Sequence, residues 1–109
     1  MITWTLADTL QHSLQIAGYK AQKFVSLEEC WKHIVHDKPC LVIMDWHMND
    51  SMSPVVFISL VHSKFPNLAI YVLSADKRVR DKVTHLGAKF LLKPCQVDEI
   101  QEICAQHCA

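Results

Sequence analysis

Three residues of the chain combine side-chain types and positions that suit the transfer of a phosphoryl group. Asp45, Ser74 and Lys93 each stand at the carboxyl end of a short apolar run. Uninterrupted apolar runs of this length are typical of parallel strands that are buried on both faces. Open α/β sheets bind their ligands at the carboxyl ends of such strands, so we expect the three side chains to converge there. A carboxylate can attack phosphorus, and a hydroxyl and an ammonium can stabilise the charge of the phosphoryl oxygens.

Strands must alternate with helices along the chain for these three positions to share one edge. Apolar residues recur at helical spacing between the short apolar runs, which indicates amphipathic helices. Strands that alternate with helices form a parallel sheet with right-handed crossovers, so we predict a single α/β domain over residues 1–109. The expected strands are 20–25, 40–45, 68–73 and 89–92, and the expected helices are 6–17, 27–34, 55–64, 77–86 and 97–104.

Local signals mark the ends of several predicted helices. Ser26 begins a capping box, in which a serine hydroxyl and a glutamate satisfy free backbone donors. Ser53 followed by Pro54 is typical of a helix start. Gly18 and Gly87 each follow a helical stripe, where a helix favours glycine as it ends.

The bulk composition excludes several classes of protein. The 109 residues suit one domain with one core, and half of them are hydrophobic. Lysine plus arginine equals aspartate plus glutamate at 11 each, so no net charge favours nucleic acid or an anionic membrane. The apolar runs are too short to span a bilayer, and no signal peptide is visible. We interpret the basic cluster as a solvated helix face; it consists of Lys77, Arg78, Arg80 and Lys82.

The five cysteines favour a reducing compartment. Their number is odd and Cys40 lies inside an apolar strand pattern, so we predict a cytoplasmic protein whose cysteines act as small hydrophobic residues. Cys104, His107 and Cys108 fall within about one turn at the end of the last predicted helix, but no CxxC pair accompanies them. We therefore interpret these three residues as the frayed end of a helix rather than as metal ligands.

Four segments of the sequence resemble the receiver domain of bacterial two-component response regulators. In chain order they resemble the second strand and helix of that family, its phosphoacceptor strand, its switch-hydroxyl strand and its last strand with a lysine. The resemblance implies a flavodoxin-like, doubly wound parallel sheet of four or five strands. The segments are 17–29, 43–48, 72–75 and 87–94.

The resemblance also implies a role for individual residues. Asp45 matches the phosphoacceptor, Ser74 the switch hydroxyl, Lys93 the lysine that contacts the phosphoryl group, and Phe90 the switch aromatic residue. The implied partner is a histidine kinase or a phosphotransfer protein, and nucleic acid would be contacted only through a separate output domain or protein. The interval between Ser74 and Lys93 is a few residues shorter than usual for the family, which puts the fourth helix in doubt.

The beginning of the chain departs from the family pattern. Receivers begin with an apolar strand that ends in paired acids, and no acidic pair stands here. Either residues 2–6 form the first strand, which leaves Asp8 as one surviving acid, or the first strand is absent. We favour its absence, because the apolar stripe of residues 6–17 is helical throughout. A partner chain would then complete the sheet, as in a strand-exchanged homodimer.

The magnesium site that the resemblance implies is weakened by this departure. Mg²⁺ prefers carboxylate oxygens in octahedral geometry, and receivers hold it with acids from the first strand beside the phosphoacceptor. Here Asp45 and Asp8 are the acids available to it. Asp50, in the loop after the phosphoacceptor strand, is a less favoured substitute.

Two functions are open at this point. The chain is a receiver that accepts a phosphoryl group on Asp45 and signals through a conformational switch, or it is a degenerate receiver that serves as an interaction or dimerisation module. An unrelated flavodoxin-like binding domain is disfavoured, because a chain with two glycines has no Gly-rich phosphate loop. The chain would catalyse only its own phosphorylation and dephosphorylation, so we do not expect an enzyme.

Overall fold

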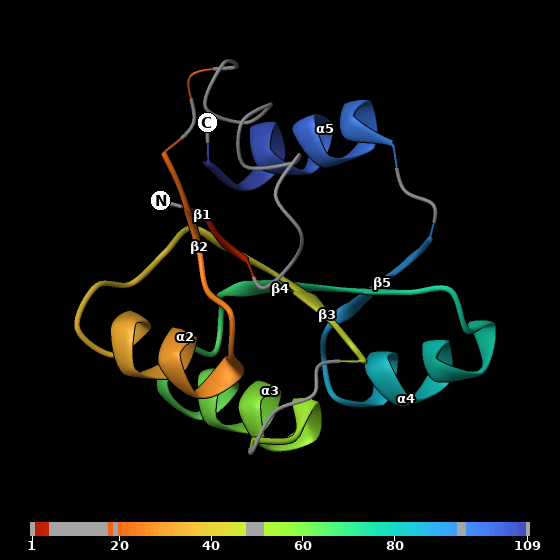
Figure 1. Ribbon diagram of the computed structural model, residues 1–109, viewed down its shortest axis with the longest axis horizontal. Coiled ribbons are helices and arrows are strands. Elements are labelled where there is room, and N and C mark those ends of the chain that lie inside the picture. The colour runs from red at the N-terminus through yellow and green to blue at the C-terminus, as the bar shows by residue number, and fades with distance from the viewer. Residues whose placement is uncertain (1, 5–17, 19, 48–51, 94–95, 109) are drawn as a thin grey trace.

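The sheet has five parallel strands with helices on both faces. The computed structural model describes residues 2–4, 18, 20–47, 52–93 and 96–108. Within them the strand order is β2-β1-β3-β4-β5, the doubly wound order of flavodoxin-like folds. Figure 1 shows the strands crossing the middle of the molecule. The predicted fold class is therefore confirmed, and the strands are β1 (Ile2–Trp4), β2 (Ala21–Lys23), β3 (Leu41–Asp45), β4 (Ala69–Ser74) and β5 (Lys89–Leu92).

The prediction that the first strand is absent is wrong. β1 pairs in parallel with β2 on one side, where Ile2 faces Ala21, and with β3 on the other, where Ile2 faces Leu41. The chain thus fills the interior place of the sheet by itself, and strand exchange with a partner is not needed to cover it. The helical stripe that argued against this strand lies in residues 6–17, outside the described residues.

Four helices are described, and their starts agree with the local sequence signals. Ser26 accepts a hydrogen bond from the Glu29 amide at 3.1 Å, and Ser53 accepts one from the Val56 amide at 3.1 Å. A 3₁₀ turn takes up part of the expected fourth helix, which is correspondingly short. The helices are α2 (Leu27–Ile34), α3 (Pro54–Lys64), α4 (Arg80–His85, after the 3₁₀ turn Lys77–Val79) and α5 (Val97–Cys108). None of the described helices is long and apolar enough to cross a membrane.

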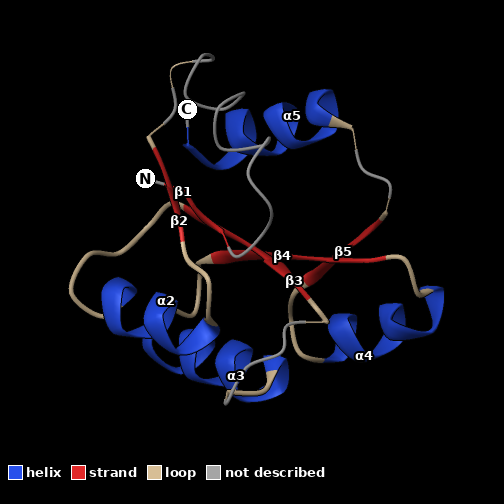
Figure 2. Cartoon of the chain, viewed as in Figure 1, coloured by secondary structure: helices blue, strands red, loops and turns tan. Residues whose placement is uncertain are grey.

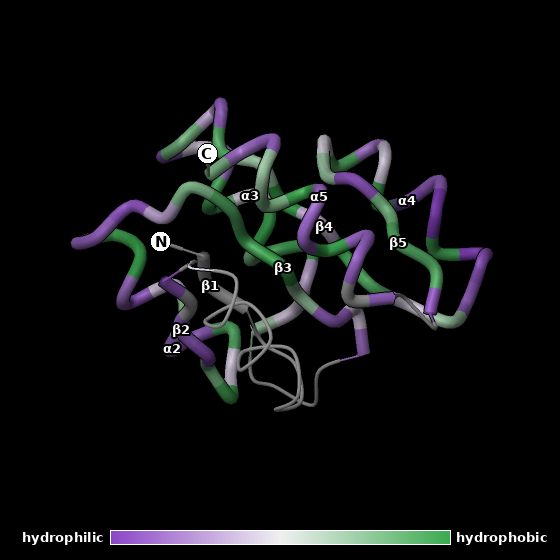
Figure 3. Tube along the Cα trace, turned by 90° about the horizontal axis from the view of Figure 1, so that it is seen from above, coloured by the Kyte–Doolittle hydropathy of each residue, from purple (hydrophilic) through white to green (hydrophobic). Residues whose placement is uncertain are grey.

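The two faces of the sheet bury separate apolar clusters. α2, α3 and α4 cover one face and α5 lies against the other (Figure 2). Alternate residues of β3 divide between them, because successive side chains of a strand point to opposite faces: Val42 and Met44 join the first cluster, and Leu41 and Ile43 the second. All four are fully buried, and Figure 3 shows β3 as hydrophobic over most of its length. Burial on both faces explains why the sequence of this strand is an unbroken apolar run.

Gly87 confirms the predicted end of the fourth helix. Its φ of +84° lies in the left-handed region that favours glycine, and its amide donates to the Thr84 carbonyl. A Cβ at this position would lie 2.7 Å from Cε1 of His62 on α3. The close approach of this ring therefore also favours glycine at position 87. Gly18 has a φ of +92°.

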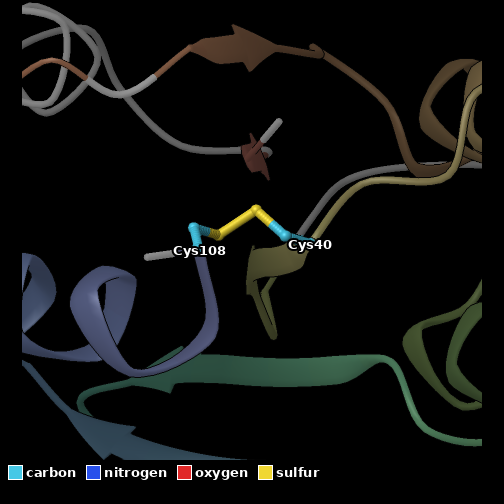
Figure 4. The surroundings of a disulfide bond; sticks show 2 residues. All are labelled: Cys40 and Cys108. Atoms are coloured by element: carbon cyan, nitrogen blue, oxygen red, sulfur yellow. A yellow bond between two sulfur atoms is a disulfide. The ribbon is translucent and has the colours of Figure 1, made fainter.

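A disulfide joins Cys40 to Cys108, which corrects the prediction that Cys40 is a reduced, strand-embedded thiol. Figure 4 shows the bond linking the residue before β3 to the last residue of α5. The end of α5 is therefore tied to the sheet rather than frayed, and His107 bonds to the Tyr71 hydroxyl with 3.1 Å between Nε2 and the oxygen. Within the described residues no group of three His, Cys, Asp or Glu side chains is placed to hold a metal ion.

Candidate functional site

The carboxyl ends of β3, β4 and β5 lie side by side. Asp45 is in register with Leu73, and Ser74 with Leu92. Backbone pairing continues past the strands, because the Trp46 amide donates to the Leu73 carbonyl and the Lys93 amide to the Ser74 carbonyl, each at 3.0 Å. The parallel register therefore brings the three predicted site residues to one edge, as the sequence analysis expected.

Asp45 and Lys93 form an ion pair. The ammonium Nζ of Lys93 donates to Oδ2 of Asp45, and the two side chains are 35% and 17% exposed, respectively. A charge-assisted hydrogen bond in such a partly desolvated place is stronger than one between neutral groups. The Lys93 ammonium thus lies where it could stabilise negative charge on a group bound to Asp45.

His47 is a site residue that the sequence analysis missed. Its backbone amide donates to Oδ1 of Asp45 at 3.0 Å, and its Nε2 lies 3.2 Å from Oγ of Ser74. Which of these two side-chain atoms donates depends on the imidazole tautomer. Its position two residues after the acidic strand end was the available signal, but the sequence does not show the direction of the ring.

Among the described residues, Ser74 is the one buried polar residue, and it has no exposed surface. Besides His47, its Oγ accepts a hydrogen bond from the Asp76 amide at 3.0 Å. A buried hydroxyl needs such partners, because an unsatisfied one would be destabilising. Ser74 is therefore held in place by His47 and by the turn that follows β4.

The turn after Ser74 has its own acid–base pair. Asp76 accepts hydrogen bonds from the Arg78 amide and side-chain Nε, both at 2.9 Å, and from Nη2 at 3.0 Å. The hydrogen bonds from the Arg78 side chain, followed by the backbone one, hold the pKa of the Asp76 carboxyl below its ordinary value. Asp76 is thus engaged in shaping this turn beside the site.

Phe90 lies on β5, half-buried against the cluster that α2, α3 and α4 cover. The guanidinium of Arg80 stands over its ring, 5.4 Å from the centroid. A cation at this distance from an aromatic face is attracted to it. The predicted switch residue therefore links β5 to the start of α4, and its switching role stays a prediction.

The described part of the site does not by itself fit a magnesium ion. It offers one carboxylate, Asp45, whose two oxygens already accept hydrogen bonds from Lys93 and His47. Mg²⁺ prefers several oxygen ligands. Asp8 and Asp50, the other acids considered, lie outside the described residues.

The family model described as the response regulator receiver domain matches residues 4–105 of the chain. No curated protein sequence matches it.

Solved receiver structures share the fold at low sequence identity. The receiver domain of NtrX from Brucella abortus has a TM-score of 0.85 at 15% identity, over 97% of this chain and 95% of that one. The chemotaxis protein CheY4 from Vibrio cholerae has a TM-score of 0.81 at 18% identity, over 97% and 95%. Against a longer NtrX chain from Brucella abortus the TM-score is 0.85 at 15% identity, and this chain covers 26% of its length. These likenesses agree with the five-stranded sheet, and the family match over nearly the whole sequence shows that the chain belongs to the receiver domains of two-component response regulators.

Proposed function

We propose that Asp45 accepts a phosphoryl group from a histidine kinase or a phosphotransfer protein, and that the chain signals through the resulting change at its sheet edge. The observation that carries this proposal is the ion pair of Asp45 with Lys93, beside the Ser74 hydroxyl on the strand between them. The acid, the ammonium and the hydroxyl come from three neighbouring strands and meet at one edge.

The chemistry follows from the positions of these groups. An oxygen of the Asp45 carboxylate attacks the phosphorus of a phosphohistidine whose other ring nitrogen is protonated, the phosphorus–nitrogen bond breaks, and the electron pair of this bond leaves with the neutral imidazole. The acyl phosphate carries roughly two negative charges in place of the single charge of the carboxylate, and it brings strong acceptor oxygens to the strand ends. Lys93 is the described cation already in contact with Asp45, so its ammonium supports the proposed stabilisation of the phosphoryl oxygens.

A phosphoryl group would also compete for the Ser74 hydroxyl. At present this hydroxyl contacts His47 and accepts from the Asp76 amide. Where the hydroxyl donates to the His47 imidazole, donation to a phosphoryl oxygen requires it to turn away from that ring. Because Asp76 begins the turn that leads to α4, this exchange supports a switch that passes from Ser74 toward α4 and Phe90.

The intact mass of the pure protein, measured after incubation with acetyl phosphate and Mg²⁺, tests the proposal. We expect the gain of one phosphoryl group, its loss in Asp45→Asn, and its retention in the matched variant Asp81→Asn on the exposed surface of α4. Chelation by EDTA reports on the proposed Mg²⁺, which Asp45 and Asp8 would hold. Labelling of folded Asp45→Asn at the wild-type level would exclude Asp45 as the acceptor.

The alternative is a degenerate receiver that serves as an interaction module. It is favoured by the closed state of Asp45, both of whose oxygens have partners, and by the single carboxylate in the described part of the site. Absence of labelling in folded wild-type protein, with a kinase-independent donor at saturating concentration, would favour this function.

Further proposals concern the setting in which the chain works. We place it in the cytoplasm, as a protein that is not an enzyme toward other substrates. We also propose a homodimer, formed without strand exchange because β1 is in place. Sedimentation equilibrium of the phosphorylated and unphosphorylated protein measures this directly, and a monomer in both states at high concentration would contradict it.

A further inference from the structure

Cys40 and Cys108 connect two elements that are far apart in the sequence. Cys40 directly precedes β3, the strand that ends at Asp45, and Cys108 is the last residue of α5. The bond lies beside the beginning of β3 (Figure 4), at the end of this strand opposite to Asp45. Sixty-eight positions separate the two residues in the sequence, so their pairing depends on the folded arrangement of α5 over the sheet.

The described cysteines divide into an accessible pair and two buried thiols. Cys40 and Cys108 are half-buried, whereas Cys30 and Cys104 have no exposed surface. Burial raises the pKa of the Cys104 thiol to about 11. Since the thiolate is the species that attacks a disulfide, Cys104 stays inert although it lies one helical turn before Cys108.

A disulfide in a receiver proposed to be cytoplasmic needs an explanation. Disulfides in a reducing cytosol are rare, and those that occur are usually transient or redox-sensing. We propose that Cys40 and Cys108 form a reversible redox site that reacts with small-molecule thiols and disulfides and sets whether the last turn of α5 is fastened to the sheet. The inference stands on the disulfide and its surroundings and does not require Asp45 to be phosphorylated.

The oxidation balances with glutathione disulfide as the oxidant. The thiolate of one cysteine attacks a sulfur of glutathione disulfide, which forms a mixed disulfide and releases one glutathione. The thiolate of the other cysteine then attacks the protein sulfur of the mixed disulfide and releases the second glutathione. Two electrons pass from the protein dithiol to glutathione disulfide, and the two thiol protons end on the two glutathione molecules.

Reduction would act on the last turn of α5 rather than on the whole helix. Ile100, Ile103 and Cys104 are buried against the sheet and hold the body of α5 without the disulfide. Beyond them, the described contacts of the last turn include the disulfide, the packing of Cys108 against this cluster, and a hydrogen bond and an edge-on ring contact between His107 and Tyr71. Because these noncovalent contacts are individually weak, opening of the disulfide should release this turn locally.

Redox trapping of the native protein tests the reversible site. The protein is equilibrated with mixtures of reduced and oxidised glutathione, quenched with an alkylating reagent and mapped by peptide mass. We expect the oxidised form to lack the two alkyl groups that Cys40 and Cys108 carry in the reduced form and to show these two cysteines linked, and we expect a dithiol to reverse this without denaturant. A bond that resists the dithiol in the native state, a stable glutathione adduct, or a disulfide that uses Cys95 would each overturn the proposal.

Hydrogen exchange of the two redox states tests the effect on α5. Amides of residues 105–108 should exchange on the order of tenfold faster after reduction, whereas those of β3 should not change. Cys40→Ser should exchange like the reduced protein under all conditions, and the matched variant Cys95→Ser should keep the redox response. Equal exchange of the last turn in both redox states of the wild type would refute the fastening role, whether or not the variants fold.

Discussion

The Asp45 carboxylate and the Lys93 ammonium form an ion pair across the ends of β3 and β5, although β4 lies between these strands. The lysine side chain therefore reaches over the end of β4, where Ser74 is buried. Because the pair spans three strands, it can form only when the ends of β3, β4 and β5 are aligned. Removal of either charge should leave the sheet intact, because its register is fixed by backbone pairing.

Lys93→Ala should lower the rate of phosphoryl acceptance by about 10²–10³-fold, the usual effect of losing one group that stabilises developing charge. Its stability should change by less than about 1 kcal/mol, because a partly exposed ion pair contributes little to folding. Time courses of intact mass with acetyl phosphate measure the rate, with the exposed Lys89→Ala as control. A wild-type rate in Lys93→Ala would remove the lysine from the mechanism.

His47→Ala should raise the phosphorylated fraction at a fixed, subsaturating concentration of acetyl phosphate. The His47 ring holds the Ser74 hydroxyl, and removal of this contact lets the hydroxyl turn toward a phosphoryl oxygen. The net free energy of a typical hydrogen bond corresponds to a change of roughly twofold to tenfold in the equilibrium between phosphorylated and unphosphorylated protein.

His47→Gln provides the conservative comparison, because glutamine keeps a side-chain amide that can contact Ser74. Its phosphorylated fraction should lie between those of the wild type and His47→Ala, and His85→Ala on the exposed face of α4 should match the wild type. A fall in the phosphorylated fraction of His47→Ala would show that the ring assists the reaction instead of competing with the phosphoryl group.

The free energy of unfolding of Cys40→Ser should be about 4 kcal/mol lower than that of the oxidised wild-type protein, according to the chain-entropy description of a loop of this length. The disulfide spans 68 positions, so its removal frees most of the unfolded chain. Urea unfolding without reductant measures the difference, and Cys108→Ser should give the same value because both variants remove one bond. A difference below about 1 kcal/mol in both variants would mean that the bond does not form in solution.

Gly87→Ala should destabilise the protein by more than about 1–2 kcal/mol, the usual penalty for a Cβ at positive φ. The added Cβ would also meet the His62 ring. Gly18→Ala is the matched control, because its φ is also positive while nothing lies within 4 Å of its Cβ. Thermal unfolding of both variants, and of Gly87→Ala combined with His62→Ala, separates backbone strain from the contact. An equal loss in the two glycine variants would exclude the contact with His62.

The strand ends could be predicted because β3 and β4 are buried on both faces and leave unbroken apolar runs in the sequence. β1 could not, because three residues are too few to show a period beside a longer helical stripe. The Cys40–Cys108 bond depends on how α5 lies over the sheet, and the contact between His47 and Ser74 depends on the direction of one ring. Both are tertiary contacts, and the spacing of residues along the sequence does not reveal them.

β3 and the C-terminal segment from Lys93 to Cys108 are joined at both ends. The ion pair of Asp45 with Lys93 closes one end, and the disulfide between Cys40 and Cys108 closes the other. A mechanical consequence is expected in the oxidised protein: when Lys93 is drawn from the carboxylate toward a new anion, the disulfide and the buried side chains of α5 keep the helix from following it along the sheet. Movement should then be concentrated at the Lys93 end of this segment, next to the acid.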